Sequence, residues 1–216
     1  MKNKNFEYLD KVPSANRVIE HIQSNGLLKT ANTLKFITLS VGEFDEEDLD
    51  WALEFTNRCF NNFLERKFIK KFIRQAIRIE RSIKSQIYLK IGINKSFWNY
   101  YDKKVKDIIP GGWRKIEIDP ILGKPGKFNV HIHIFCENSF IPHSLLSEVW
   151  KDVLSKEFKG KKVNPPGIVD VRNVNNTDLD IATLTNYMAK PVEYLRTERF
   201  KNVRLFAFFG TWYSKN

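Results

Sequence analysis

The sequence predicts an α+β domain in which β-strands and amphipathic helices share one hydrophobic core. Of its 216 residues, 42% are hydrophobic and 13% aromatic, enough to build that core without disulfide or metal staples. Segments 34–41, 113–119 and 129–136 alternate in polarity as strands do, and segments with helical spacing lie between them. Because no repeat or long linker divides the chain, we expect one main domain, residues 34–216, after an N-terminal extension, residues 1–33.

The first elements are a strand at 34–41 (LKFITLSV) and a helix whose first turn carries the acids of 45–48. A second helical segment, 65–90, has an apolar side and a basic side. The basic side contains Lys67, Lys70, Lys71, Arg74, Arg78 and Arg81. Like charges this close repel one another by a few tenths of a kcal/mol per pair, roughly, unless an anion lies against them. We therefore expect a track for a nucleic-acid phosphate backbone, with a solvated helix face as the alternative.

A hairpin with metal-binding side chains is expected next, formed by 113–119 and 129–136 around the Gly- and Pro-containing connection 120–127. Pairing about residue 124 brings Glu117 level with His131. His133, two residues beyond His131, projects from the same face, while Ile132 points into the core. An acid and two imidazoles then form a mixed site with open coordination positions. The alternatives are ordinary sheet histidines and a Glu117 that pairs with a lysine.

The remaining elements are a helix at 144–158, a strand at 168–174 and a helix at 178–195 that is interrupted near Pro191. On this last helix Tyr187 lies off the apolar side and shares its side with Lys190, three residues on. A phenol needs a nearby cation, base or metal-polarised electrophile to act as a nucleophile. Lys190 and the metal site could provide this help; the alternative is a half-buried tyrosine beside a solvated lysine.

Charge and targeting signals narrow the class of protein. The chain has 36 Lys+Arg against 25 Asp+Glu, a net charge of +11, which points to nucleic acid first and to an anionic membrane surface second. No apolar run approaches the roughly 18 residues of a membrane span, and the N-terminus has no signal-peptide core. We expect a cytoplasmic protein with no membrane partner, in which Cys59 and Cys136 are reduced and buried.

Four motifs in order resemble those of rolling-circle replication initiators of the HUH endonuclease superfamily, particularly those of small plasmids. They are TLS (38–40), GWRKIEI (112–118), NVHIHIF (129–135) and NYMAK (186–190). The resemblance covers roughly residues 34–195 and implies a central antiparallel β-sheet flanked by helices, an RRM-like or ferredoxin-like arrangement. It also implies that Glu117, His131 and His133 bind Mg²⁺ or Mn²⁺. Tyr187 would attack the scissile phosphate, and Lys190 would be the motif lysine beside it.

The activity implied by this resemblance is site-specific nicking of single-stranded DNA at a replication origin, with a 5′-phosphotyrosine link and a free 3′-OH as products. Because the chain has no GxxxxGK[ST] phosphate loop, unwinding and synthesis would fall to a host helicase and polymerase. Thr183 occupies the position at which some members of the family carry a second tyrosine or a glutamate, so the termination mechanism stays open. For Tyr194 we expect a structural role.

Three other functions remain open. A relaxase or a single-strand transposase would use the same chemistry. A non-catalytic, RRM-like nucleic-acid-binding domain would also combine a basic surface with exposed aromatic side chains, for which Trp98, Tyr100 and Tyr101 are candidates. Such a binder has no need of the set Glu117, His131, His133 and Tyr187.

Overall fold

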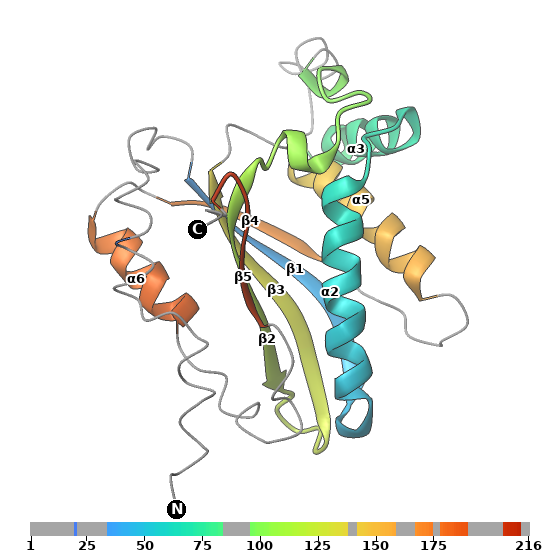
Figure 1. Ribbon diagram of the computed structural model, residues 1–216. Coiled ribbons are helices and arrows are strands. Elements are labelled where there is room, and N and C mark those ends of the chain that lie inside the picture. The colour runs from blue at the N-terminus through green and yellow to red at the C-terminus, as the bar shows by residue number, and fades with distance from the viewer. Residues whose placement is uncertain are drawn as a thin grey trace, which may run out of the picture.

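The computed structural model describes residues 34–83, 96–137, 142–158, 167–174, 178–189 and 205–212, together with Glu20. In these ranges it has a five-stranded antiparallel sheet with helices on both faces (Figure 1). The strands are β1 (Leu34–Asp45), β2 (Gly111–Pro120), β3 (Lys127–Glu137), β4 (Val169–Asn173) and β5 (Phe206–Gly210). The helices are α2 (Leu49–Glu65), α3 (Lys70–Ile83), α5 (His143–Glu157) and α6 (Asp178–Ala189), with short 3-10 turns at Glu46–Asp48 and Val105–Asp107.

The strand order confirms the predicted fold class. The strands lie in the order β4-β1-β3-β2-β5, and every neighbouring pair is antiparallel. With α2 between β1 and β2, and α5 between β3 and β4, the first four strands form the βαββαβ arrangement of ferredoxin-like folds. Strand β5 extends this sheet beside β2, and no strand was predicted there from the sequence.

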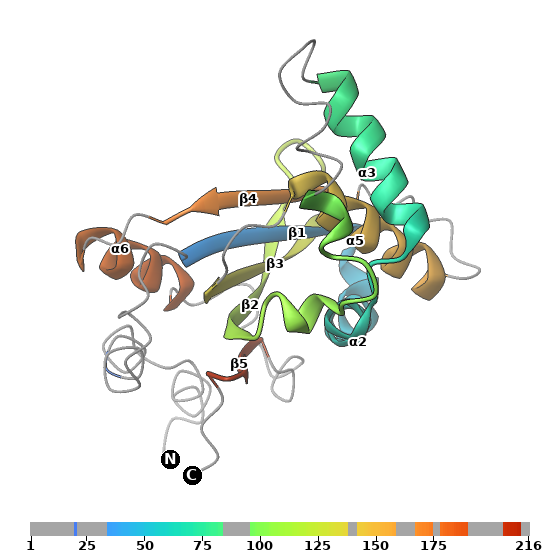
Figure 2. The ribbon, with the colours of Figure 1, turned by 90° about the horizontal axis from the view of Figure 1, so that it is seen from above.

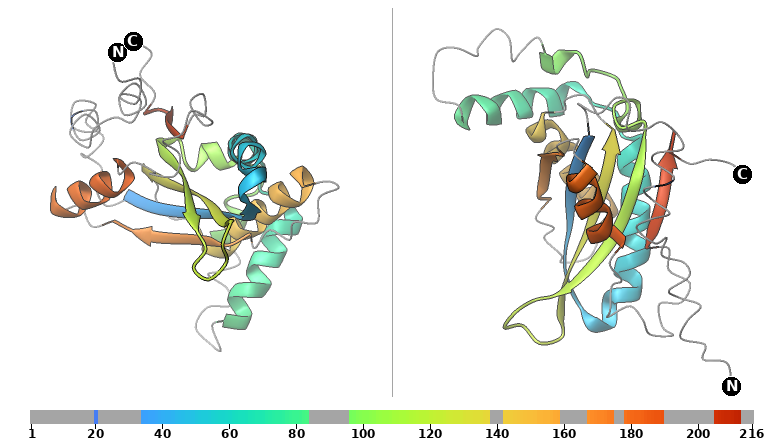
Figure 3. Two further views of the ribbon diagram at one scale, coloured as in Figure 1. Left: turned by 90° about the horizontal axis from the view of Figure 1, so that it is seen from below. Right: turned by 90° about the vertical axis from the view of Figure 1, so that its left-hand side faces the viewer.

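One face of the sheet packs against α2 and α5 (Figure 2). Side chains of β1 and β3 that point to this face, such as Leu39 and Ile132, are fully buried. Trp150 of α5 lies against Phe63 of α2 and donates a hydrogen bond from Nε1 to the Ser40 carbonyl oxygen at 2.7 Å. These contacts leave the opposite face of the sheet for α6 (Figure 3).

The two cysteines are buried and free, as the sequence predicted. Cys59 lies on the inner side of α2, where burial raises the pKa of its thiol to about 12. Cys136 lies on β3. Neither is placed to act as a nucleophile, because the reactive form of cysteine is the thiolate.

The basic helix expected at 65–90 is not continuous. Helix α2 runs to Glu65, and α3 begins only at Lys70. Between them the backbone pairs with a later segment: Phe68 N donates to Lys103 O at 2.9 Å, and Val105 N donates to Arg66 O at 3.0 Å. The Phe68 side chain is fully buried, so long-range packing overrides the helical pattern here. Residues 84–90 lie outside the described residues.

The start of β2 depends on glycine. The sequence predicted a strand from 113, but β2 already includes Gly111 and Gly112. A Cβ atom on Gly112 would lie 2.5 Å from the Phe135 carbonyl oxygen, so only glycine allows the two strands to pair this closely.

None of the helices in the described ranges combines the length and the apolar character needed to cross a membrane. The expected N-terminal extension, 1–33, and the end of the chain after 212 lie outside the described residues, apart from Glu20.

Candidate metal and tyrosine site

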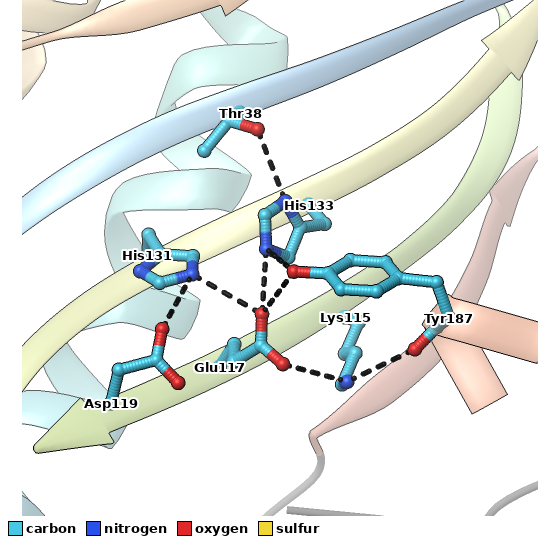
Figure 4. A network of polar contacts seen from close by, with 7 residues as sticks. All are labelled: Thr38, Lys115, Glu117, Asp119, His131, His133 and Tyr187. Atoms are coloured by element: carbon cyan, nitrogen blue, oxygen red, sulfur yellow. Dashed lines mark hydrogen bonds and ion pairs between the residues drawn. The ribbon is translucent and has the colours of Figure 1, made fainter. Parts of the chain in front are cut away.

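The site lies on the sheet face that carries α6, across the three adjacent strands β1, β3 and β2 (Figure 4). In the antiparallel register His131 pairs with Glu117, as predicted from the hairpin. One row along, His133 pairs with Lys115 on one side and with Thr38 on the other. All of these side chains project to one face because residues two apart in a strand share it.

Glu117, His131 and His133 present three donor atoms that lie within 4.8 Å of one another. Glu117 Oε2 is 2.7 Å from His133 Nε2 and 3.3 Å from His131 Nε2. An ion bound at about 2.1 Å to each donor would hold them roughly 3 Å apart, so the spacing fits a divalent metal. Imidazole ligands suit Zn²⁺ and Fe²⁺, and a carboxylate suits Mg²⁺ and Mn²⁺, so this mixed set could hold a divalent metal ion. The three predicted ligand residues therefore come together in one cluster.

The charge on Glu117 is stabilised by its neighbours. Burial by itself would raise the pKa of this carboxyl group, but hydrogen bonds from His131 and His133 and the charge of Lys115 lower it well below its usual value. Burial also lowers the pKa of His133, which favours the neutral imidazole. A charged carboxylate and neutral imidazoles are the forms that bind metal ions.

Thr38 orients His133. Its Oγ1 lies 3.1 Å from Nδ1 of His133, while Nε2 of the same ring faces Glu117. Metal binding through Nε2 requires the ring proton on Nδ1, which would then donate to the Thr38 hydroxyl. Phe36 stacks on the ring at a centroid distance of 5.1 Å. Thr38 belongs to the TLS motif but was not predicted to contact a ligand, and Phe36 was not predicted at the site, although both alternate on β1 toward the site face.

Tyr187 reaches the cluster from α6. Its hydroxyl donates to Glu117 Oε2 at 2.9 Å and lies 3.2 Å from His133 Nε2. Partial burial and the neighbouring carboxylate raise the pKa of this phenol above its usual value. The residue is nevertheless 41% exposed, so part of it is open to solvent. The hydroxyl contacts two of the donor atoms of the cluster, Glu117 Oε2 and His133 Nε2.

Lys115 is a buried cation at the site that was not predicted as a site residue. Its ammonium group lies 3.0 Å from Glu117 Oε1 and 3.4 Å from the Tyr187 carbonyl oxygen (Figure 4). It also lies 5.4 Å from the centre of the Tyr187 ring. Lys115 thus holds one carboxylate oxygen, leaves Oε2 facing the histidines, and links β2 to the end of α6. The alternation of the strand, which places Lys115 on the same face as Glu117, was the sequence signal that could have identified it.

Lys115→Met is expected to lower the free energy of unfolding of the metal-free protein by about 3 kcal/mol, because it leaves the Glu117 charge with less compensation in a buried place. Denaturant titration of Lys115→Met, Glu117→Gln and the double variant measures this. The double variant should lose clearly less stability than the sum of the single variants. If the stability losses of the two single variants were strictly additive in the double variant, Lys115 and Glu117 would not stabilise each other.

Asp119 lies at the edge of the cluster. Its Oδ2 is 3.4 Å from His131 Nε2, and its side chain is exposed. It adds a negative charge beside the proposed ligands without entering the set of three donors.

The predicted DNA-binding residues whose side chains the structure describes are not brought to this site. Lys67, Lys70, Lys71, Arg74 and Arg78 are exposed, but α3 packs on α5, in the helix layer on the other face of the sheet from α6 (Figure 1; Figure 3). Arg81 belongs to α3, but its side chain lies outside the described residues, as do Lys190, Tyr194 and the expected kink at Pro191. DNA binding by the α3 cations stays a prediction.

Comparisons with known proteins identify no relative: no family model matches the chain, and neither do curated proteins or solved structures.

Proposed function

We propose that this protein is a metal-dependent, site-specific single-strand DNA endonuclease and strand transferase, a rolling-circle replication initiator of the HUH type. The observation that carries the proposal is the meeting of a tyrosine hydroxyl with a His-His-Glu cluster, 2.9 Å from Glu117 Oε2 and 3.2 Å from His133 Nε2. These residues come from three separate elements, which makes a chance contact of ordinary surface groups a poor explanation. The order of the motifs, which resembles that of HUH initiators, supports the same function.

In the proposed reaction the Tyr187 oxygen attacks the scissile phosphorus. The new O–P bond forms while the bond to the 3′ oxygen breaks, so the products are a 5′-phosphotyrosine and a free 3′-OH. The phenol gives up its proton, and the leaving 3′ oxygen takes one up. Since the link is still a phosphodiester, a 3′-OH can later reverse the step and rejoin the strand without ATP.

The residues of the site have separate tasks in this reaction. His131, His133 and Glu117 would hold Mg²⁺ or Mn²⁺, which supplies Lewis-acid stabilisation of charge on a non-bridging phosphate oxygen. Thr38 and Phe36 fix the ring of His133. Phe36 also meets the ring of Tyr187 edge to face, with centroids 6.1 Å apart, and so orients the nucleophile.

The decisive experiment determines which end of the cleaved DNA strand becomes attached to the protein. The purified protein is mixed with Mn²⁺ and a single-stranded oligonucleotide that spans the nick site of its own replicon. A label at the 3′ end should migrate with the denatured protein, whereas a label at the 5′ end should be released on a shorter, free strand. Cleavage with both labels free would indicate a hydrolytic nuclease. If the protein cleaved the oligonucleotide neither with Mn²⁺ nor with Mg²⁺, the proposal would be contradicted.

A non-catalytic nucleic-acid-binding domain is the second candidate. The sheet order β4-β1-β3-β2 favours it, because four-stranded RNA-recognition domains combine such a sheet with stacking aromatics. This candidate predicts binding to the oligonucleotide without any covalent product, so the same experiment separates the two. A relaxase or a single-strand transposase would also form the adduct and differs only in the DNA that it cuts.

A further inference from the structure

We propose that a second surface, on the helix side of the sheet, binds single-stranded DNA by base stacking. This surface, the aromatic patch, consists of Trp98, Tyr101 and the two lysines beside them, Lys67 and Lys70. It lies next to the start of α3, whereas Tyr187 is carried by α6 on the opposite face (Figure 1). The inference goes beyond the proposed nicking activity, since it needs neither the metal nor Tyr187.

The two rings of the patch are exposed although most large aromatic side chains of the described residues are not. Trp98 is 39% exposed and Tyr101 is 45% exposed. Trp113, Trp150 and Trp212, in contrast, are exposed by 1% or less. Neighbouring exposed aromatic rings at a polar surface are typical of a binding site.

The exposed rings are held in place by a hydrogen-bonded backbone. Tyr101 N donates to Trp98 O at 3.1 Å, and Asp102 N donates to Phe68 O at 3.0 Å. Asp102 has a left-handed backbone with a φ of 64°, which lets the chain turn back beside 66–68. The buried side chain of Phe97 anchors the same turn. Because the backbone that carries the rings is fixed by these bonds, binding a ligand costs less entropy there than it would on a loose loop.

The geometry of the rings leaves room for a ligand. Their centroids are 6.1 Å apart and their planes meet at 61°, so the rings contact edge to face and do not stack on each other. A nucleotide base can stack on such an exposed ring, and stacking tolerates any base because each has a π face.

Two lysines lie beside the rings, and one of them, Lys67, is paired with an acid. The Lys70 ammonium group lies 5.7 Å from the centre of the Tyr101 ring, and Lys67 pairs with Asp102 at 3.0 Å. Further along α3, the exposed Lys71, Arg74 and Arg78 form no ion pair with another described residue. Stacking surfaces beside a line of cations match a strand that offers unpaired bases and regularly spaced phosphates. A duplex fits less well, because its bases are already stacked inside it.

The test measures binding of the full chain to an oligo(dT) of about 20 nucleotides, with EDTA present so that no metal-dependent cleavage occurs. Trp98→Ala and Tyr101→Ala are each expected to weaken binding about tenfold, the effect of losing one stacked base. Trp98→Phe keeps a stacking ring, so it should bind nearly as well as the wild type but show less quenching of tryptophan fluorescence by DNA. This conservative variant also guards against a fold that fails in the alanine variants.

The matched control is Leu122→Ala, which removes an exposed hydrophobic side chain from the tip of the β2–β3 hairpin and should leave binding unchanged. Lys70→Ala should make the slope of log affinity against log salt concentration shallower by about the amount expected for one lost phosphate contact. Equal binding by the wild type and by a Trp98→Ala/Tyr101→Ala double variant would overturn the proposal. So would tighter binding of an acidic peptide or of a duplex than of oligo(dT).

Discussion

Tyr187→Phe should abolish strand cleavage and the covalent protein–DNA adduct while DNA binding persists. Phenylalanine keeps the ring but lacks the oxygen that would attack phosphorus, so the cleavage rate should fall by at least about 1,000-fold, as it does when other enzymes lose a nucleophile. The ring contacts with Phe36 and His133 remain possible, which protects the fold. A denaturing gel with 3′-labelled DNA measures the adduct, and fluorescence anisotropy measures binding.

Two comparisons make this prediction specific. Tyr100→Phe removes a hydroxyl from a tyrosine that packs against Phe68, away from the cluster, and should keep full activity. The Mn²⁺ affinity of Tyr187→Phe should equal or exceed that of the wild type, because the hydroxyl no longer contacts the ligand atoms of Glu117 and His133. Full cleavage by Tyr187→Phe would remove this residue from the mechanism.

His131→Ala should remove metal-dependent cleavage and lower the Mn²⁺ affinity by at least about 100-fold, because one of three protein ligands is lost. His131 is the cleaner choice of the two histidines: it is only partly buried, whereas His133 is 5% exposed and stacks on Phe36. Replacing His133 would therefore also open a space in the packing. Titration calorimetry or Mn²⁺ electron paramagnetic resonance measures affinity independently of activity.

The matched histidine control is His143→Ala. His143 begins α5, hydrogen-bonds the Val169 carbonyl oxygen and is not part of the cluster. Its replacement should leave Mn²⁺ affinity unchanged. If His131→Ala bound Mn²⁺ as tightly as the wild type, the two histidines would be ordinary sheet residues and the metal would have to bind elsewhere.

The strands and the hairpin register could be predicted because they depend on local patterns. Alternation of polarity marks β2 and β3, and a short connection can join them in few ways, so Glu117 was placed opposite His131 correctly. The helix expected at 65–90 was wrong in its continuity. The helical spacing of apolar residues continues through 66–69. In the structure, however, Phe68 is buried and the backbone pairs with 103–105, so these residues are not helical.

The parts of the site that could not be predicted are those made across distant segments. Thr38 contacts His133 over 95 positions of sequence, and Lys115 contacts the Tyr187 carbonyl oxygen over 72. A lysine on an alternating strand resembles an outward-facing residue. Only the addition of α6 and β5 around it buries Lys115 and makes it a partner of Glu117.

The sequence by itself determined the α+β class, the hairpin and the candidate ligand set, since periodicity and short-range pairing are local properties. The tertiary structure alone brought the Tyr187 hydroxyl to within 2.9 Å of Glu117 and put Lys115 beneath them. It also decided that the basic side of α3 and the Tyr187 site lie on opposite faces of the sheet, a separation that no charge pattern reveals. The physical reason is that packing between elements depends on long-range burial, and residues distant in sequence decide which faces meet.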